Sequence, residues 1–372
     1  MKEEKKDKGE ELIDVDEKGN PIEIKKQEKK SKSNSLYKIV IIVFLCILIL
    51  CCCYYVFYYK KNNKNVFDET TLKNLKLKNR VFLGPISHSI QKIEEAVKND
   101  VALVITEGSV VSDYTPWNLQ PEGPFRIDSD EYIPEIKKLA DIVHKYNSYI
   151  LLDLVHQGLA GVEPPIYSPS GGKGLLNKEL DSKAMTIEDI LRIEEKYVQA
   201  ALRAKKAGFD GVEIHGGQFS LLSLFSSQLF NKRTDNYGGN DENRARFMVE
   251  IVKKVREAIG NDMIISAKID GTDENFGFTE SGFLTLGKEL EKAGLDLVEV
   301  SGPNPSRDGE MFFYEPTKKL AEILKIPVIC LGGIKTYEQA DYILKNSKIE
   351  YIGMSRALMK EPNLVKIWNN NK

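Results

Sequence analysis

His215 and Gln218 stand three residues apart, directly after the apolar run of residues 211–214. Imidazole and carboxamide groups can both donate hydrogen bonds, and two such donors can hold a carbonyl oxygen and stabilise negative charge that develops on it. A lone histidine is usually structural. This one, however, follows a predicted strand and adjoins two glycines. The spacing therefore predicts a site that binds and polarises a carbonyl group.

Lys268 lies inside another apolar run, residues 263–269. A buried lysine must find an anionic partner or lose its charge. One interpretation is an ion pair with Asp270 or Glu299. The other is a cation that faces an electron-rich ring, which becomes anionic when it is reduced.

Two later segments have the composition of a phosphate site. Gly332 and Gly333 would expose backbone N–H groups in a loop, and Ser355 with Arg356 would add a hydroxyl and a guanidinium. The Gly-Gly pair alone could be a tight turn, and the arginine alone could be a surface charge. The two halves together favour phosphate binding.

Eight short runs rich in Val, Ile or Leu alternate with amphipathic segments from about residue 67. The runs do not alternate polar with apolar residues, which is typical of strands buried on both faces. The predicted strands are residues 81–83, 101–106, 149–154, 211–214, 263–269, 297–300, 326–330 and 351–354. The predicted helices are residues 91–98, 132–146, 186–207, 242–259, 280–293, 315–325, 336–345 and 363–369.

This alternation predicts an α/β protein with a (β/α)8 TIM barrel. An open doubly wound sheet is the main alternative, but the GxGxxG turn that usually follows its first strand is absent from the sequence. Nearly every predicted strand ends in a polar residue or glycine. Because a barrel builds its active site from the carboxyl ends of its strands, these residues are expected to meet.

The N-terminal part has a different composition. Residues 1–38 are rich in Lys and Glu and predict a disordered, charged tail. Residues 39–59 carry no charge and are long enough to cross a bilayer as one helix. A cleaved signal peptide is the alternative, but the run is long and far from the N-terminus. We therefore predict a single-pass membrane helix at 39–59, a linker at 60–66 and a barrel at 67–372. Which side of the membrane holds the barrel stays open.

The composition also argues against several classes of protein. The net charge is −2, from 53 basic and 55 acidic residues, which gives no case for a nucleic-acid partner. Only Cys330 lies outside the apolar run, so neither a disulfide framework nor a cysteine metal site is expected in the globular part. The four histidines contain no close ligand pair, so no metal site is expected.

Together these segments resemble the old yellow enzyme family of FMN-dependent ene-reductases. Within it they are most similar to the bacterial NADH:flavin oxidoreductases and the barrel part of the 2,4-dienoyl-CoA reductases. The resemblance covers about residues 66–368 and is most specific in GFDGVEIHG, NKRTDNYGG with ENRARF, and YIGMSRALMKEPNLVKIW. It implies FMN across the barrel mouth, NADH or NADPH as reductant, and a small electron-poor acceptor such as an α,β-unsaturated carbonyl compound.

The resemblance also implies roles for individual residues. The implied catalytic residues are His215, Gln218 and Ser220. The implied cofactor-binding residues are Pro85, Ile86, Ser87, Gly108, Asp153, Lys268, Gly332, Gly333, Ser355 and Arg356. The RTD–YGG loop and ENRARF are interpreted as scaffold, with charged side chains that fix the loop after the fourth strand.

Four features depart from the family pattern. Gln218 replaces the second His or Asn of the carbonyl-binding pair, but its amide can still donate. Ser220 replaces the usual proton-donating Tyr, and a serine hydroxyl is far less acidic. Asp153 replaces the Gln of the third strand, so it could accept from the flavin N3–H but could not donate. The segment between the first strand and Val101 is also short.

Three hypotheses follow. The first is a membrane-anchored FMN oxidoreductase that uses NAD(P)H to reduce an electron-poor acceptor. The second is a degenerate flavin-binding barrel with little ene-reductase activity, acting as an electron carrier or interaction protein. The third is a phosphosugar lyase or isomerase that uses Lys268 in a Schiff base or proton transfer. The physiological acceptor, the nicotinamide preference and the oligomeric state do not follow from the sequence.

Overall fold

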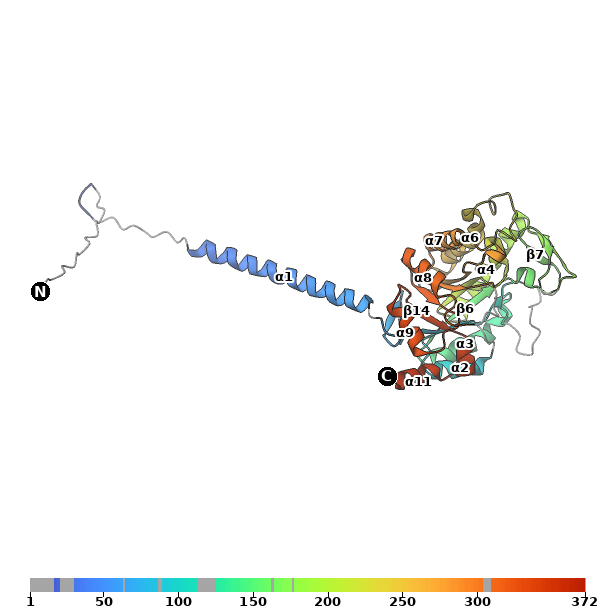
Figure 1. The fold of residues 1–372 in the computed structure, drawn as a ribbon, viewed down its shortest axis with the longest axis horizontal. Helices are drawn as coiled ribbons and strands as arrows, with labels where there is room; N and C mark the ends of the chain where they lie inside the picture. Colours follow the sequence, from blue (N-terminus) through green and yellow to red (C-terminus); the bar gives the residue numbers. More distant parts are fainter. Residues whose placement is uncertain are drawn as a thin grey trace. The chain divides into compact units, whose positions relative to one another are not determined.

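The computed structural model describes residues 17–20, 30–62, 64–85, 89–112, 125–161, 164–175, 177–303 and 309–371 (Figure 1). The chain divides into two units, Met1–Asn62 and Asn63–Lys372. The first unit contains one long helix, α1 (Lys30–Asn62). Its window Tyr37–Tyr54 has a mean hydropathy of 2.7 and no buried residue, so its length and composition suit a membrane span.

The helix boundaries correct two predictions. α1 begins at Lys30, inside the predicted tail of residues 1–38, and ends at Asn62, inside the predicted linker of residues 60–66. The prediction followed the uncharged run, whereas the helix continues into its lysine-rich flanks because lysine is a good helix former. In the second unit, Lys64 is already buried, and its Nζ donates to the carbonyl oxygen of Ile349 at 2.5 Å.

The described part of the second unit contains eight parallel strands that close into a ring. They are β3 (Val81–Leu83), β4 (Leu103–Ile105), β6 (Tyr149–Val155), β10 (Gly211–Gly216), β11 (Ile264–Asp270), β12 (Leu297–Ser301), β13 (Val328–Cys330) and β14 (Tyr351–Met354). Each pairs with the next along the chain, and β14 pairs with β3. The predicted barrel and its strands are confirmed, with differences of at most two residues at the ends.

The predicted helices are also confirmed. They are α2 (Ile90–Lys98), α3 (Ile133–His144), α4 (Ile187–Lys206), α6 (Asp241–Ile259), α7 (Glu280–Lys292), α8 (Tyr314–Ile323), α9 (Tyr337–Lys345) and α11 (Leu364–Asn370). Thr186 and Asp189 form a capping box that begins α4. Gly260 ends α6 with a φ of 77°, a conformation that favours glycine.

Several short elements were not predicted. They are β1 (Thr70–Leu72), β2 (Leu75–Leu77), β5 (Ser109–Val110), β7 (Ile166–Ser168), β8 (Gly172–Lys173), β9 (Asp181–Ala184), α5 (Leu221–Ser226) and α10 (Arg356–Lys360). β1 and β2 form a hairpin whose Leu72, Leu75 and Leu77 pack in one cluster with residues from the amino ends of the barrel strands. The hairpin therefore closes the barrel at the end opposite the strand carboxyl ends.

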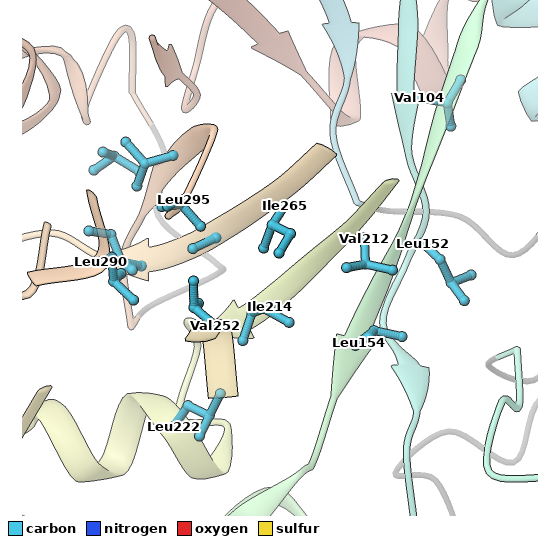
Figure 2. Packing of buried hydrophobic residues seen from close by; sticks show 14 of the residues in the cluster. Val104, Leu152, Leu154, Val212, Ile214, Leu222, Val252, Ile265, Leu290 and Leu295 are labelled. Carbon is cyan, nitrogen blue, oxygen red and sulfur yellow. The ribbon is translucent and has the colours of Figure 1, made fainter. Parts of the chain in front are cut away.

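Alternation along each strand separates the core from the barrel interior. Val212 and Ile214 of β10 face outward into an apolar layer that includes Val252 of α6 and Leu290 of α7 (Figure 2). Because successive side chains of a strand point to opposite faces, Glu213 and His215 must point into the barrel. The alternation that places apolar side chains in the outer core therefore also places polar side chains inside the barrel.

The variant Phe247→Ala provides a test of this core packing. Phe247 is completely buried on α6, and its ring centroid lies 4.8 Å from that of Phe225. Phe247→Ala is expected to lower the free energy of unfolding by about 3–5 kcal/mol, because the cavity cannot close fully. Urea denaturation of the full chain measures this. Leu191→Ala, at a side chain that is 48% exposed, is the control, and equal losses for the two variants would contradict the assignment of Phe247 to the core.

The loop after β10 is held by its own charged side chains. Arg233 donates to the carbonyl oxygens of Pro169 and Met185 and forms an ion pair with Asp235. The Asn231 amide donates to two further carbonyl oxygens, those of Phe225 and Tyr237. These contacts support the interpretation of the RTD–YGG segment as scaffold.

Candidate active site

The strand register brings buried polar side chains from four strands together. His215 on β10 is paired with Lys268 on β11, and Lys268 is paired with Glu299 on β12. Glu213 on β10 is paired with Asp153 on β6. Paired residues of parallel strands point to the same face, so all five side chains project into the barrel. All five are buried, with His215 the most exposed at 8%.

Asp153 contacts His215 directly. Its Oδ2 lies 2.7 Å from the His215 Nδ1, and the Asp153 side chain is fully buried. A carboxylate can only accept, so the Nδ1 carries the hydrogen. The other oxygen, Asp153 Oδ1, has no hydrogen-bond partner among the described residues. Asp153, which was expected at the cofactor, therefore orients the His215 ring and keeps one carboxylate oxygen available.

Lys268 forms an ion pair with Glu299, as one of the two interpretations of its buried position predicted. Its Nζ lies 3.3 Å from Glu299 Oε1, with side-chain exposures of 3% and 0%. Burial lowers the pKa of Lys268, but Glu299, Glu213 and Asp153 outweigh it, and the net shift is upward. A charged ammonium is a poor nucleophile, so this environment disfavours the Schiff-base hypothesis.

Glu213 adds a second buried carboxyl group. Its Oε2 accepts from Ser266 Oγ at 2.8 Å. Burial, and then the negative charges of Glu299 and Asp153, raise the pKa of Glu213 well above its ordinary value. Burial and the neighbouring carboxylates thus disfavour the ionised form of Glu213 within this cluster.

Asp270 fixes the backbone of the loop that carries Gln218. Its carboxylate accepts from the Gln218 N–H at 3.1 Å and from Ser223 Oγ at 2.5 Å. Burial raises the pKa of Asp270 to about 6, although these hydrogen bonds oppose the shift. Gln218 itself has a φ of 56°, and its side chain is exposed. The sequence analysis considered Asp270 only as a possible partner of Lys268 and did not identify its contact with the Gln218 backbone.

The Ser220 hydroxyl is engaged within the loop. Its Oγ donates to the carbonyl oxygen of His215 at 3.0 Å, and the residue is only 4% exposed. This bond stabilises the turn between β10 and α5. In this arrangement the hydroxyl hydrogen faces the protein backbone, so Ser220 is not positioned as a replacement for the tyrosine acid.

The two glycines of the predicted phosphate site have φ values of 93° at Gly332 and 75° at Gly333. A Cβ on Gly332 would lie 2.6 Å from the rings of Phe312 and Phe313, so chain packing alone requires glycine there. Ser355 precedes α10, and Arg356 is exposed. The tight-turn interpretation thus explains the glycines, and a phosphate remains compatible with Ser355 and Arg356.

Two further predicted residues, Pro85 and Gly108, lie at strand ends near the same cluster. Pro85 is half-buried just after β3, and a Cβ on Gly108 would lie 3.8 Å from Asp153 Oδ2. Ile86 and Ser87 lie outside the described residues. Glu107, to which the sequence analysis assigned no role, is half-buried beside this cluster, and burial followed by the charge of Asp153 raises its pKa.

Unpartnered polar atoms test whether FMN fits here. Among the described residues, Asp153 Oδ1, Ser109 Oγ and Ser301 Oγ are buried without a hydrogen-bond partner. Such groups are costly unless a ligand or water satisfies them. A flavin ring presents both N–H and carbonyl groups, which match a carboxylate acceptor and hydroxyl or ammonium donors. The residues of the mouth therefore fit this cofactor.

A sizeable surface groove lies elsewhere. It has a volume of about 840 Å³ and is lined by hairpin residues together with His144 and Asp210. Asp210 precedes β10, so the groove is at the amino end of the barrel. None of the predicted site residues lines it. The chemistry-bearing side chains, and not the size of this groove, identify the candidate site.

His156, at the end of β6, makes stability depend on pH. Its Nδ1 accepts the Gly158 N–H at 3.2 Å, and burial lowers its pKa to about 4. The unfolded chain binds the proton more readily, so about 3 kcal/mol of stability, complete above pH ~6.5, is lost as the pH falls towards 4. Asp270, whose pKa is raised, acts in the opposite direction over part of this range.

His156→Asn is expected to reduce this acid-side loss, because an asparagine oxygen can still accept from Gly158 and does not titrate. Urea midpoints of the full chain at about pH 7.5 and pH 5 measure the effect. The natural protein should lose more stability than the variant. His144→Asn, at a partly exposed histidine, is the control. Parallel losses in the natural protein and His156→Asn would contradict the account.

Comparison with known proteins identifies the family of this chain. Residues 65–371 match the model of the NADH:flavin oxidoreductase / NADH oxidase family. The chain is 30% identical to the NADH oxidase of Thermoanaerobacter brockii, over 80% of this chain and 50% of that protein. It is 31% identical to the NADPH dehydrogenase of Halalkalibacterium halodurans, over 80% of this chain and 91% of that protein. The chain thus spans about half the length of some relatives and nearly all of others.

Solved structures show the same barrel. Morphinone reductase in complex with tetrahydroNAD superposes with a TM-score of 0.70 at 27% identity, covering 83% of this chain and 91% of that one. Old Yellow Enzyme from Pichia sp. AKU4542 gives a TM-score of 0.70 at 26% identity, covering 83% and 88%. A 2-naphthoyl-CoA reductase, at 22% identity and a TM-score of 0.75, shares the fold over 52% of its length.

Proposed function

Since this chain belongs to the NADH:flavin oxidoreductase / NADH oxidase family of FMN-dependent enzymes, we propose that it is a membrane-anchored NAD(P)H oxidoreductase that reduces α,β-unsaturated carbonyl compounds. The observation that carries the acceptor class is the buried His215, oriented by Asp153 at the end of β10. Because the His215 Nδ1 is hydrogen-bonded to Asp153, Nε2 is the ring nitrogen that can bind a carbonyl oxygen.

The chain's own residues would bind the cofactor as follows. FMN would supply hydride transfer between the nicotinamide and the acceptor. Asp153 Oδ1 would accept from a ring N–H, and Lys268 would donate to the polar edge of the ring. The ring would be lined by Pro85, Ile86, Ser87 and Gly108, and the phosphate would be held by Gly332, Gly333, Ser355 and Arg356.

The acceptor would bind against His215 and Gln218. The Asp270 carboxylate holds the Gln218 backbone, which fixes the position from which the exposed side chain can reach the site. Two donors on one carbonyl oxygen would stabilise the negative charge that develops there when hydride reaches the β-carbon.

Turnover by the full chain tests this function. The purified, FMN-loaded protein is mixed anaerobically with NADH or NADPH and a panel of enones and quinones. Enone-dependent oxidation of the nicotinamide is expected. The second hypothesis, a degenerate flavin-binding barrel, is motivated by the engaged hydroxyl of Ser220 and by the departure at Asp153. Bound FMN with no consumption of NAD(P)H on any acceptor would favour that hypothesis instead.

The membrane anchor rests on α1. The apolar window Tyr37–Tyr54 is long enough to span a bilayer, and the family match begins beyond it, at residue 65. Carbonate washing of membranes from cells that express the full chain tests the proposal. The protein should stay in the pellet and be released by detergent. Recovery in the carbonate supernatant would contradict a spanning helix.

A further inference from the structure

The contact between Asp153 and His215 has a consequence for proton transfer. We propose that Asp153 is a positioning residue that lets His215 bind a carbonyl oxygen only in its doubly protonated form, so that the histidine supplies the proton for the reduction. This inference rests on the proposed function and identifies the acid of that site. Asp153 acts through His215 and does not itself touch the acceptor.

The donors and acceptors of Asp153 and His215 determine which form of the histidine can bind a carbonyl oxygen. The Asp153 carboxylate accepts from the His215 Nδ1–H at 2.7 Å. In the neutral ring with hydrogen on Nδ1, Nε2 has only a lone pair. A carbonyl oxygen also offers only lone pairs, so the two would not bond. A second proton on Nε2 is needed, and the buried carboxylate stabilises the resulting positive charge.

The loop offers no competing acid at the usual position. The Ser220 hydroxyl donates to the His215 carbonyl oxygen at 3.0 Å, which directs its hydrogen away from the acceptor. A protonated imidazole is a much stronger acid than a serine hydroxyl near neutral pH. The departure at Asp153 therefore compensates for the departure at Ser220.

The step balances as follows. Hydride that originates from NAD(P)H adds to the β-carbon, and the C=C π electrons shift towards the carbonyl oxygen. The Nε2 proton moves to that oxygen and gives an enol, which becomes the saturated ketone by exchange of protons with water. NAD(P)H is oxidised, the C=C bond is reduced, and one proton is consumed. His215 regains its Nε2 proton from solvent, while the Nδ1–H stays bonded to Asp153.

Other charged groups also act on His215. Its pairing partner Lys268 on β11 opposes the second proton, and several carboxyl groups favour it. The groups with an electrostatic interaction with His215 include Glu107 after β4, Asp270 on β11 and Glu299 on β12. Lys268 is itself paired with Glu299, which offsets the charge of the ammonium group.

The kinetic test uses Asp153→Asn in the full-length, FMN-loaded protein. The asparagine amide would donate to Nδ1, which leaves hydrogen on Nε2 of a neutral ring. Reoxidation of the reduced enzyme by an enone is expected to slow by roughly 10²-fold or more, with little change in KM. The alkaline decline of this rate in the natural protein should disappear. Asp210→Asn is the matched control, because Asp210 Oδ2 bonds His144 Nε2 at 2.8 Å at the far end of the barrel.

A second readout does not depend on turnover. In the protein labelled with [15N]histidine, the His215 signals can be assigned by their loss in His215→Asn. With the saturated ketone cyclohexanone bound, both ring nitrogens of His215 should carry hydrogen. In Asp153→Asn only Nε2 should do so.

The proposal is overturned if the natural protein binds the ketone with a bare Nδ1, or if Asp153→Asn keeps the natural rate and pH profile. If the ketone-bound protein shows the doubly protonated ring but no enone is reduced, the role of Asp153 stands and the proposed function fails.

Discussion

Replacing His215 by alanine is expected to lower kcat/KM for an enone by roughly 10³-fold, because the variant loses both a donor to the carbonyl oxygen and the acid. Reduction of the bound flavin by NAD(P)H should change much less, since His215 acts on the acceptor. Stopped-flow measurement of the two half-reactions separates these effects.

His144→Ala provides the control for this variant. His144 also bonds an aspartate, Asp210, but it lies in the groove at the amino end of the barrel. Its loss should leave both half-reactions unchanged. Equal rates of enone reduction in His215→Ala and the natural protein would show that another residue polarises the acceptor.

Replacing Lys268 by methionine is expected to lower the stability of the protein strongly. The change would leave the fully buried Glu299 without its ion-pair partner, beside Asp153. Breaking a buried pair in this way costs about 3–5 kcal/mol, since one charge is left uncompensated. The full chain should show this loss in urea denaturation, together with weaker FMN binding by fluorescence titration.

Two further variants separate charge from size. Lys268→Arg keeps a cation and should retain most of the stability and the FMN affinity. The double variant Lys268→Met with Glu299→Gln removes both charges and should regain much of the lost stability while FMN binding stays weak. If the double variant were no more stable than Lys268→Met, the ion pair would not be the cause of the loss.

The barrel was predictable from the sequence because each buried strand is a short apolar run and each helix has a strong amphipathic pattern. Thr186 with Asp189 at the start of α4 and Gly260 at the end of α6 are residue types that favour helix ends. The hairpin of β1 and β2 was not predicted, because a strand of three residues is too short to show a periodic pattern. Its Leu side chains become buried only when they pack against the closed barrel.

The site was predictable in part. His215, Asp153 and Lys268 could be placed at strand ends, but their mutual contacts depend on strand register, which a single sequence does not determine. Asp153 was expected at the cofactor, and its bond to His215 appears only when β6 and β10 are paired. For the same reason, the buried carboxyl groups of Glu213 and Glu299 could not be recognised as one charged cluster around Lys268.

The contacts of this cluster connect residues that depart from the family pattern described in the sequence analysis. An acidic residue on β6 engages the histidine, a serine after β10 caps the turn, and a lysine offsets the buried carboxylates. The departures at Asp153 and Ser220 both contact His215 and are therefore better understood together than one at a time.

An anaerobic visible spectrum of the full-length protein tests the central claim most directly. The detergent-purified chain, supplied with FMN and freed of excess, should show a flavin band near ~450 nm. Addition of NADH or NADPH should bleach the band, and a subsequent enone should restore it. A protein that binds no FMN, or whose bound FMN is not reduced by either nicotinamide, would contradict the account.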